Sequence, residues 1–569
     1  MTTANITVGA SSYQETKWHS INWDGAHRLV RRLQVRIAKA ISQGRWNKAK
    51  ALQRLLTHSF YSKAVAVKRV TENHGKKTPG VDGATWKTPE LKAKAVNSLK
   101  RRGYKPQPLR RVYIPKANGK LRPLGIPTMK DRAMQALHLL ALQPIAETTA
   151  DHNSYGFRPD RACRDAVGQC FIALATKKSA PWVLDADISG CFDQINHDWL
   201  LANIPMDKAI LHKWLKSGFV EGGNWFPTIA GTPQGGIASP TLANMTLDGM
   251  EALLEKRFGA KSSRKGKQNK INFIRYADDF VITGATEAIL VEAKTLIEEF
   301  LKERGLSLSD EKTKIVHIEE GFDFLGWNVR KYDGKLLIKP AKKNVQTFLR
   351  KIRKIIRDNK TAKQEAVIRL LNPVIRGWAN YHQNQVAKET FNNVDSAIWK
   401  QLWQWSCRRH PNKSKKWIKD KYFMSEGLRN WVFGSTVKSE DGNVKKVKLV
   451  TASDIPIRRH TKIKGDANPF NPDWEEYFEK RLGLQMKVNL RGRNKLLILW
   501  YMQEGMCPNC NDKIAKETGW NIHHIQRKTE GGKSNVVNLM LLHPKCHRQM
   551  HSREKKVTTA SGQTGVIKA

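Results

Sequence analysis

Long apolar segments are absent from this sequence of 569 residues. No run reaches the roughly 18 apolar residues that a membrane-spanning helix needs. The first 20 residues also lack a charged segment followed by an apolar one, which is the pattern of a secretory signal. We therefore expect no membrane partner, and a location in the bacterial cytoplasm, near nucleoid DNA, or in an organelle.

Cysteine is scarce, and its distribution does not suit a disulfide framework. There are seven cysteines, an odd number, and those at positions 163, 170, 191 and 407 stand apart from one another. The other three lie near several histidines in the last part of the chain. Such a cluster is typical of a metal site in a reducing compartment.

Acidic residues are half as frequent as basic ones. The chain has 51 Asp and Glu against 100 Lys and Arg, so its formal net charge is +49. A compact protein with this excess repels itself, and a polyanion is the obvious compensating partner. Nucleic-acid backbones attract such a protein through counterion release, whatever their base sequence. The charge therefore predicts nucleic-acid binding, and the length suggests three or four domains.

The order of sequence patterns indicates several units. Residues 23–60 combine apolar helical spacing with many Lys and Arg, and residues 110–327 alternate β-rich and helical stretches. Residues 342–358 carry one apolar stripe and a mostly separate basic surface, which predicts an amphipathic helix that follows a nucleic-acid backbone. Further aromatics stand in helical sequence, and we expect most of them in a core and a minority stacked on bases: Trp378, Tyr381, Trp399, Trp403 and Trp405.

Three aspartates are candidates for a metal-dependent catalytic site. Residues 181–188 have the pattern of a strand that ends near Asp187, and residues 271–283 that of a hairpin with Asp278 and Asp279 at its tip. Adjacent carboxylates repel each other unless a cation lies between them. A third carboxylate from a neighbouring strand would complete a site for two Mg²⁺ ions, roughly 3.5–4 Å apart, that activate a 3′-hydroxyl and stabilise leaving pyrophosphate.

Two Cys/His pairs near the end of the chain predict a zinc site. Cys507 and Cys510 form one pair with i, i+3 spacing, and His543 and Cys546 form the other. Four such ligands suit one tetrahedral Zn²⁺ ion with a structural role. His551 is an alternative to His543 as the fourth ligand.

The aspartates lie within an ordered series of motifs that resembles the reverse transcriptases of group II intron-encoded proteins. Residues 276–279, Tyr-Ala-Asp-Asp, are similar to the palm signature of these polymerases, and residues 187–192 resemble their first catalytic motif. The remaining motifs follow in the expected order at residues 114–127, 154–159, 231–240 and 322–327. Because no motif is degenerate, the resemblance implies an active polymerase.

This resemblance implies roles around the incoming nucleotide. Lys116 and Arg122 would hold the triphosphate, which suits their charge. Phe192 would pack under the sugar and leave no room for a 2′-hydroxyl, and Gln234 would support the nucleotide through its amide.

The C-terminal cluster resembles the ββα-metal motif of HNH nucleases. By this resemblance His524 is the general base, and Asn538 orients the loop that carries it. His523 and His547 would hold Mg²⁺ or a similar divalent ion, although many HNH proteins have Asp at the first of these positions. The alternative is a zinc ribbon that only binds DNA.

Taken together, the resemblances imply a multidomain α+β fold. Residues 1–335 would form the fingers and palm of a right-hand polymerase, and residues 336–410 a helical thumb with maturase function, because residues 371–381 resemble that domain. Residues 411–490 would be a small DNA-binding region, and residues 491–569 a zinc-containing ββα-metal HNH domain.

The function implied is an RNA-directed DNA polymerase that binds its intron RNA and assists splicing. It would support intron mobility by target-primed reverse transcription, after its HNH domain nicks the target duplex DNA, and would use deoxynucleoside triphosphates. A reverse transcriptase of another lineage, such as a retron or defence enzyme, is one alternative, which the maturase-like block and the HNH-like tail disfavour. A non-catalytic splicing factor is another, and the complete set of aspartates disfavours it.

Overall fold

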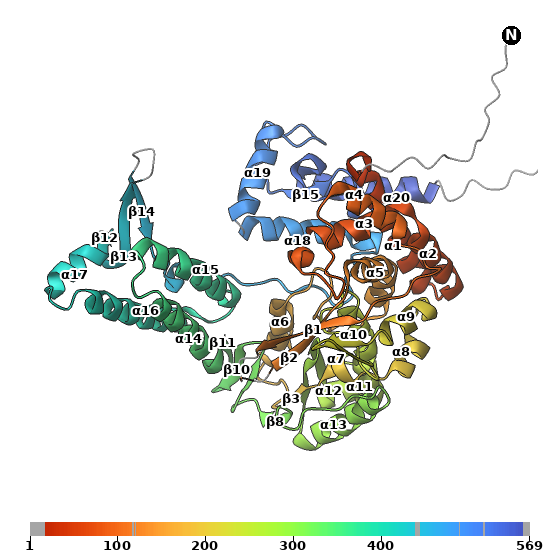
Figure 1. The fold of residues 1–569 in the computed structure, drawn as a ribbon, viewed down its shortest axis with the longest axis horizontal. Coiled ribbons are helices and arrows are strands. Elements are labelled where there is room, and N and C mark those ends of the chain that lie inside the picture. The colour runs from red at the N-terminus through yellow and green to blue at the C-terminus, as the bar shows by residue number, and fades with distance from the viewer. Residues whose placement is uncertain are drawn as a thin grey trace, which may run out of the picture.

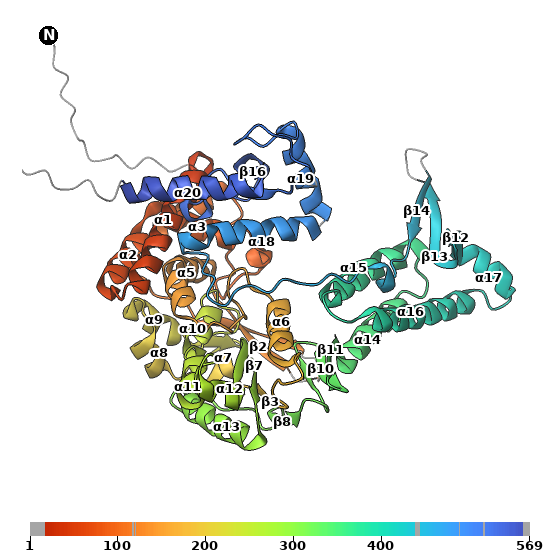
Figure 2. The ribbon, with the colours of Figure 1, turned by 180° about the vertical axis from the view of Figure 1, so that it is seen from behind.

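The structure, a computed structural model, describes residues 18–115, 119, 121–438, 444–488, 490–515 and 518–560. Figures 1 and 2 show a body with an arm that projects from one side. The arm contains α14–α17 and β12–β14, whereas the last helices, α18–α20, lie over the N-terminal helices of the body. Within these described residues, no helix is both long and apolar enough to cross a bilayer.

The N-terminal part is a bundle of helices around a buried central one. Helix α1 begins at Trp23 because the side chain of Asn22 accepts a hydrogen bond from the Gly25 amide. The predicted helical character of residues 23–60 is confirmed by α1 and α2. The helices of the bundle are α1 (Trp23–Ser42), α2 (Trp46–His58), α3 (Phe60–Glu72), α4 (Pro89–Ser98) and the buried α5 (Met129–Thr149).

A small sheet follows this bundle in the order β2-β1-β4-β5. Its strands are β1 (Leu109–Pro115), β2 (Leu121–Ile126), β4 (Phe219–Glu221) and β5 (Asn224–Phe226). Lys116 follows β1 in the sequence and lies outside the described residues.

A second four-stranded sheet, the central sheet, is antiparallel in the order β6-β7-β3-β8. Its strands are β3 (Trp182–Asp187), β6 (Asn272–Tyr276), β7 (Asp279–Gly284) and β8 (Lys314–His317). Both the predicted strand and the predicted hairpin are confirmed. Side chains alternate between the two faces, so that Leu184 packs toward α13 (Glu287–Lys302) and Val183 toward α6 (Cys163–Leu174).

Six further helices complete the body around the central sheet. They are α7 (Cys191–Gln194), α8 (His197–Asn203), α9 (Lys208–Leu215), α10 (Ser239–Leu247), α11 (Met250–Phe258) and α12 (Arg264–Asn269). A three-stranded sheet then leads toward the arm; its strands are β9 (Phe322–Phe324), β10 (Trp327–Tyr332) and β11 (Lys335–Pro340).

The arm is a helical unit with its own core, capped by a small sheet. The amphipathic helix predicted from residues 342–358 is confirmed as α14 (Lys342–Asp358), with Phe348, Ile352 and Ile356 buried. Among the predicted core aromatics Trp405 is buried, Trp378, Trp399 and Trp403 are partly buried, and Tyr381 is 39% exposed. The other elements are α15 (Gln364–His382), α16 (Lys388–Arg409), α17 (Lys415–Tyr422), β12 (Phe423–Glu426), β13 (Arg429–Lys438) and β14 (Val444–Lys448).

The last unit returns to the body and packs on α1. It contains α18 (Glu475–Val488), α19 (Leu490–Met502), β15 (Asn521–His524), β16 (Leu539–Leu542) and α20 (Pro544–Ala560). Gly531 lies so close to α1 that a Cβ atom there would be 2.4 Å from the Arg28 Cα. The Arg31 Nε donates to the Lys528 carbonyl at 2.9 Å, which ties this unit to the N-terminal bundle.

Candidate active sites

The three candidate catalytic aspartates meet at one end of the central sheet. Asp187 is the last residue of β3 and lies directly opposite Asp279, the first residue of β7. Asp278 occupies the turn before β7, and its carbonyl accepts a hydrogen bond from the Ile188 amide at 3.3 Å. The antiparallel pairing of β3 with β7 thus brings together carboxylates that are far apart in the sequence.

Burial and mutual repulsion disfavour the charged forms of these carboxylates. Burial, a hydrogen bond with Asp187 and the negative charge of Asp278 raise the pKa of Asp279 to about 8. Burial and the charge of Asp187 also raise the pKa of Asp278. These carboxylates cannot all be charged unless a cation is bound between them, so a divalent cation stabilises the cluster. Their hard oxygen ligands suit Mg²⁺.

Lys312 is a further charged group at this site that the sequence analysis missed. Its Nζ lies 2.5 Å from the Asp187 Oδ2. Burial by itself would lower the pKa of Lys312, but the hydrogen bond and charge of Asp187 outweigh it and raise that pKa. The only signal in the sequence was its place just before β8, the strand next to β3.

The turn that carries Asp278 is supported by a loop from another part of the chain. Ala277 adopts a positive φ of 59°, which L-residues rarely do. The Arg275 amide donates to the Asn153 carbonyl at 2.9 Å, and Gly156 lies directly against the turn. A Cβ on Gly156 would be 2.3 Å from the Ala277 nitrogen, so glycine is required for this approach.

Three of the four predicted nucleotide-binding residues lie in described segments near the same end of the central sheet. Arg122 is exposed on β2, and its positive charge partly opposes the rise in the pKa of Asp278, so it lies near the carboxylates. Phe192 is half-buried on α7. The Gln234 carbonyl accepts a hydrogen bond from the Gly125 amide at 2.8 Å, so its loop is joined to β2.

The two Cys/His pairs form one cluster. The ligand atoms of Cys507, Cys510, His543 and Cys546 all lie within 4.8 Å of one another. His543 is therefore the residue beside the three cysteines, and its Nδ1 lies 3.3 Å from the Cys510 Sγ. His551 belongs to a different cluster. Three thiols and one imidazole fit the tetrahedral sites that Zn²⁺ prefers.

A second cluster unites the histidines of β15 and α20 with a glutamate. The ligand atoms of Glu479, His523, His547 and His551 lie within 4.8 Å of one another, and all four residues are buried. The sequence analysis had paired only His523 with His547. The i, i+4 spacing of His547 and His551 was a signal that both face the same side of a helix. Glu479 had no such signal, because it lies 45 residues before His524.

Asn538 holds the loop that follows His524. Its Nδ2 donates to the carbonyls of Gln526 at 2.9 Å and Lys533 at 2.8 Å, and its Oδ1 accepts from the Gln526 amide at 2.8 Å. The His524 Nε2 lies 3.1 Å from the Ser534 Oγ, just after this loop.

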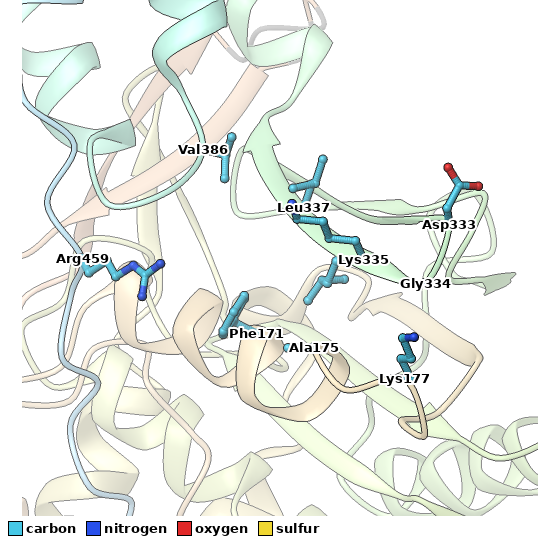
Figure 3. A pocket seen from close by; sticks show the side chains of 10 residues that line it. Phe171, Ala175, Lys177, Asp333, Gly334, Lys335, Leu337, Val386 and Arg459 are labelled. Carbon is cyan, nitrogen blue, oxygen red and sulfur yellow. The ribbon is translucent and has the colours of Figure 1, made fainter.

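One pocket lies apart from both sites. Figure 3 shows it between α6 and the β10–β11 hairpin, with Arg459 at one side. Its lining includes Phe171, Lys177, Lys335 and Leu337, and none of the residues that form the carboxylate or histidine clusters. It therefore contributes nothing to either candidate site.

Four family models match this chain in the order of its units. They describe the N-terminal domain of reverse transcriptase at residues 18–99, the reverse transcriptase (RNA-dependent DNA polymerase) at residues 114–329, the group II intron maturase-specific domain at residues 345–423 and the HNH endonuclease at residues 507–553. Protein YkfC from Escherichia coli is 35% identical over 315 residues, which cover 48% of this chain and 81% of that protein.

The group II intron-encoded protein LtrA from Lactococcus lactis is 30% identical over 437 residues, covering 60% of this chain and 71% of that protein. The chain belongs to the group II intron-encoded proteins. It is a reverse transcriptase and an HNH endonuclease with a maturase domain, and it serves intron splicing and mobility, as the sequence predicted. A solved telomerase from Candida albicans is also similar, with a TM-score of 0.32 and 12% identity over 56% of this chain and 65% of that one, which adds nothing to the assignment.

Proposed function

We propose that this group II intron-encoded protein couples its two active sites by target-primed reverse transcription. The HNH centre nicks one strand of target duplex DNA, and the carboxylate centre extends the freed 3′-hydroxyl along bound intron RNA. The observation that carries this proposal is the presence of two separate candidate catalytic centres in one chain: the aspartates at the end of the central sheet and the histidine cluster of the C-terminal unit. The product of the first reaction is the primer that the second requires.

At the polymerase centre, Asp187, Asp278 and Asp279 would hold two Mg²⁺ ions. When bound, these ions supply activation of the 3′-hydroxyl and stabilisation of pyrophosphate. Arg122 on β2 would bind the triphosphate together with Lys116, and Phe192 and Gln234 would position the sugar and the nucleotide.

The Cys/His cluster would bind a Zn²⁺ ion with a structural role. Cys507 and Cys510 come from the loop after α19, whereas His543 directly precedes α20 and Cys546 lies in the first turn of that helix. A Zn²⁺ ion held by these four residues would join the two ends of the module. Bound metal then contributes folding free energy, since the unfolded chain cannot hold these ligands together.

At the nuclease centre, His524 would act as the general base. Its ring is buried, and its Nε2 faces Ser534 beside the loop that Asn538 holds. His523 and His547 would hold a divalent ion, and the structure adds His551 as a candidate third imidazole. An imidazole nitrogen with a free lone pair suits proton abstraction from water.

The arm would hold the nucleic acids as a thumb and a DNA-binding region. The basic residues of α14 are exposed on the surface opposite its buried stripe, which suits contacts with intron RNA backbone. Beyond it, Trp417 and Trp431 are 37% and 43% exposed, and Lys419 lies 5.0 Å from the ring centre of Trp431. Exposed aromatics among lysines suit binding of DNA in the region that ends before α18.

A single variant tested on two substrates examines the coupling. His524→Ala, in complex with intron RNA, should make no cDNA on an intact duplex, because no primer is released. The same variant should copy normally from a pre-nicked duplex or from an annealed primer. The coupling is wrong if the pre-nicked target does not restore cDNA synthesis, or if the variant copies the intact target as well as the wild type does.

A further inference from the structure

Glu479 is a buried carboxylate at the nuclease centre that comes from outside the HNH segment. It lies on α18, whereas the HNH endonuclease model begins only at residue 507. Its side chain is completely buried. An ionised carboxylate in such a place is unfavourable unless it is paired and hydrogen-bonded. The groups that pair with the Glu479 carboxylate therefore indicate what it does.

Both oxygens of Glu479 are directed at the histidines of the nuclease centre. Its Oε1 accepts from the His524 amide at 2.6 Å and lies 2.9 Å from the His524 Nδ1. Its Oε2 lies 2.8 Å from the His547 Nε2 and 2.7 Å from the His551 Nε2. His523 also approaches, with its Nδ1 at 3.5 Å from Oε2. Glu479 thus connects the candidate base with all three candidate metal ligands.

Helix α18 is held in place on two sides, and these contacts fix the position of Glu479. One turn earlier, Glu475 accepts from the Lys528 amide at 2.7 Å and from the Thr529 amide at 3.3 Å, both in the nuclease loop. Arg481 donates to the Asp165 Oδ1 at 3.0 Å, at the start of α6 in the polymerase body. Figures 1 and 2 show α18 between α20 and the body.

Contact with His524 determines which ring nitrogen can take a proton from water. The Nδ1 lies against a carboxylate oxygen that can only accept, so Nδ1 carries the hydrogen and donates it. The lone pair is then on Nε2, the nitrogen that faces the loop of Asn538 and Ser534. A carboxylate that holds a histidine in this way fixes its tautomer and the orientation of its ring.

The other oxygen completes a set of metal ligands. Three imidazoles and one carboxylate converge within 4.8 Å, which is a donor set for one divalent ion. Imidazole nitrogen suits Ni²⁺ or Zn²⁺, and the carboxylate of the set also suits Mn²⁺, whereas Mg²⁺ prefers an all-oxygen set and keeps its waters. This donor set is larger than the one expected from the sequence, which named only His523 and His547 for Mg²⁺ or a similar divalent ion.

We propose that Glu479 is a metal ligand of the HNH centre and at the same time the residue that positions His524. The proposal rests on the proposed nuclease function of this centre. One oxygen of Glu479 coordinates a divalent transition-metal ion together with His523, His547 and His551, and the other holds the Nδ1–H of His524. The nuclease centre therefore extends beyond the HNH segment and includes α18, which is also bound to the polymerase body.

Binding of Mn²⁺ to the full chain tests the ligand role. Every variant in this experiment also carries Asp278→Ala and Asp279→Ala, so that the polymerase centre does not bind Mn²⁺. Electron paramagnetic resonance measures the concentration of free Mn²⁺. Glu479→Gln should weaken Mn²⁺ binding by about 10- to 100-fold, as loss of a supporting carboxylate does in other metal sites. Glu479→Asp, which keeps the charge on a shorter side chain, should bind with intermediate affinity. The control is Glu298→Gln, because Glu298 lies on α13 of the body and pairs with Lys294.

Zinc content and DNA nicking separate this role from a purely structural one. Both Glu479 variants should retain the wild-type zinc content, and, with the polymerase aspartates intact, normal primer extension. Nicking by Glu479→Gln should recover in part at high Mn²⁺ concentration, and the wild type should reach half-maximal nicking at a lower concentration of Mn²⁺ than of Mg²⁺. Unchanged Mn²⁺ affinity in both variants, or loss of zinc from both, would overturn the proposal. If the wild type binds Mn²⁺ in this way but nicks no duplex, the proposed nuclease function fails while the ligand role stands.

Discussion

Replacing Asp279 with asparagine should stabilise the polymerase body in magnesium-free buffer while abolishing cDNA synthesis. Burial and the neighbours Asp187 and Asp278 raise the pKa of the Asp279 carboxyl to about 8 in the folded chain. In the unfolded chain its pKa is the ordinary value of about 3.8. A carboxyl with a raised folded-state pKa binds more protons in the folded state, so its charge destabilises the fold increasingly as the pH rises from about 4 to about 8.

The size of this effect follows from the same values. The difference between about 8 and the ordinary 3.8 corresponds to an upper limit of about 5.7 kcal/mol, at about 1.36 kcal/mol per pKa unit. Water reaches part of this carboxyl, and asparagine keeps its shape, so we expect a realised gain of about 1–3 kcal/mol. For a body of this size, each kcal/mol shifts the melting temperature by about 2–4 °C.

Thermal unfolding of wild type and Asp279→Asn, followed by tryptophan fluorescence at pH 8 and pH 5.5, measures this gain. Chelators are omitted so that the zinc site stays intact. The gain should be larger at pH 8 than at pH 5.5, and added Mg²⁺ should reduce it, because only the wild type retains the full ligand set. Glu298→Gln, an exposed change on α13, should shift the melting temperature by little. A less stable Asp279→Asn at pH 8, or the same gain at both pH values, would refute the reasoning.

Three further predictions concern single side chains. Cys507→Ser should lose zinc and lower the melting temperature of the C-terminal unit, measured by metal analysis and calorimetry, whereas retained zinc would contradict the ligand assignment. Lys312→Gln should lower the Mg²⁺ concentration for half-maximal primer extension by about 2- to 5-fold, because the lysine no longer competes for Asp187; a higher requirement would show that this ion pair assists metal binding. Gly156→Ala should lower the free energy of unfolding by about 1–3 kcal/mol and reduce primer extension, because the added Cβ displaces the turn at Ala277. Unchanged primer extension would exclude that contact from catalysis.

Local patterns in the sequence predicted the parts of this protein that depend on neighbouring residues. The helix over residues 342–358 followed from one apolar stripe, and the hairpin over residues 271–283 from two apolar strands around an acidic turn. The pairs Cys507–Cys510 and His543–Cys546 followed from ligand spacing. Periodicity and spacing determine such features because 3.6-residue helices, two-residue strand repeats and metal-binding turns are formed within short segments. The order of the motifs along the chain also predicted the family to which the protein belongs.

Tertiary structure decided the contacts between distant segments. Lys312 meets Asp187 across 125 residues, and Glu479 meets His524 across 45, and neither pairing has a local pattern. The choice of His543 beside the cysteines, with His551 in the histidine cluster, likewise depends on how α20 packs against β15. Spacing along the chain identifies which residues can bind a metal. Only the packing of strands and helices brings them within a few ångströms of one another, and that packing is determined by buried surface from the whole chain.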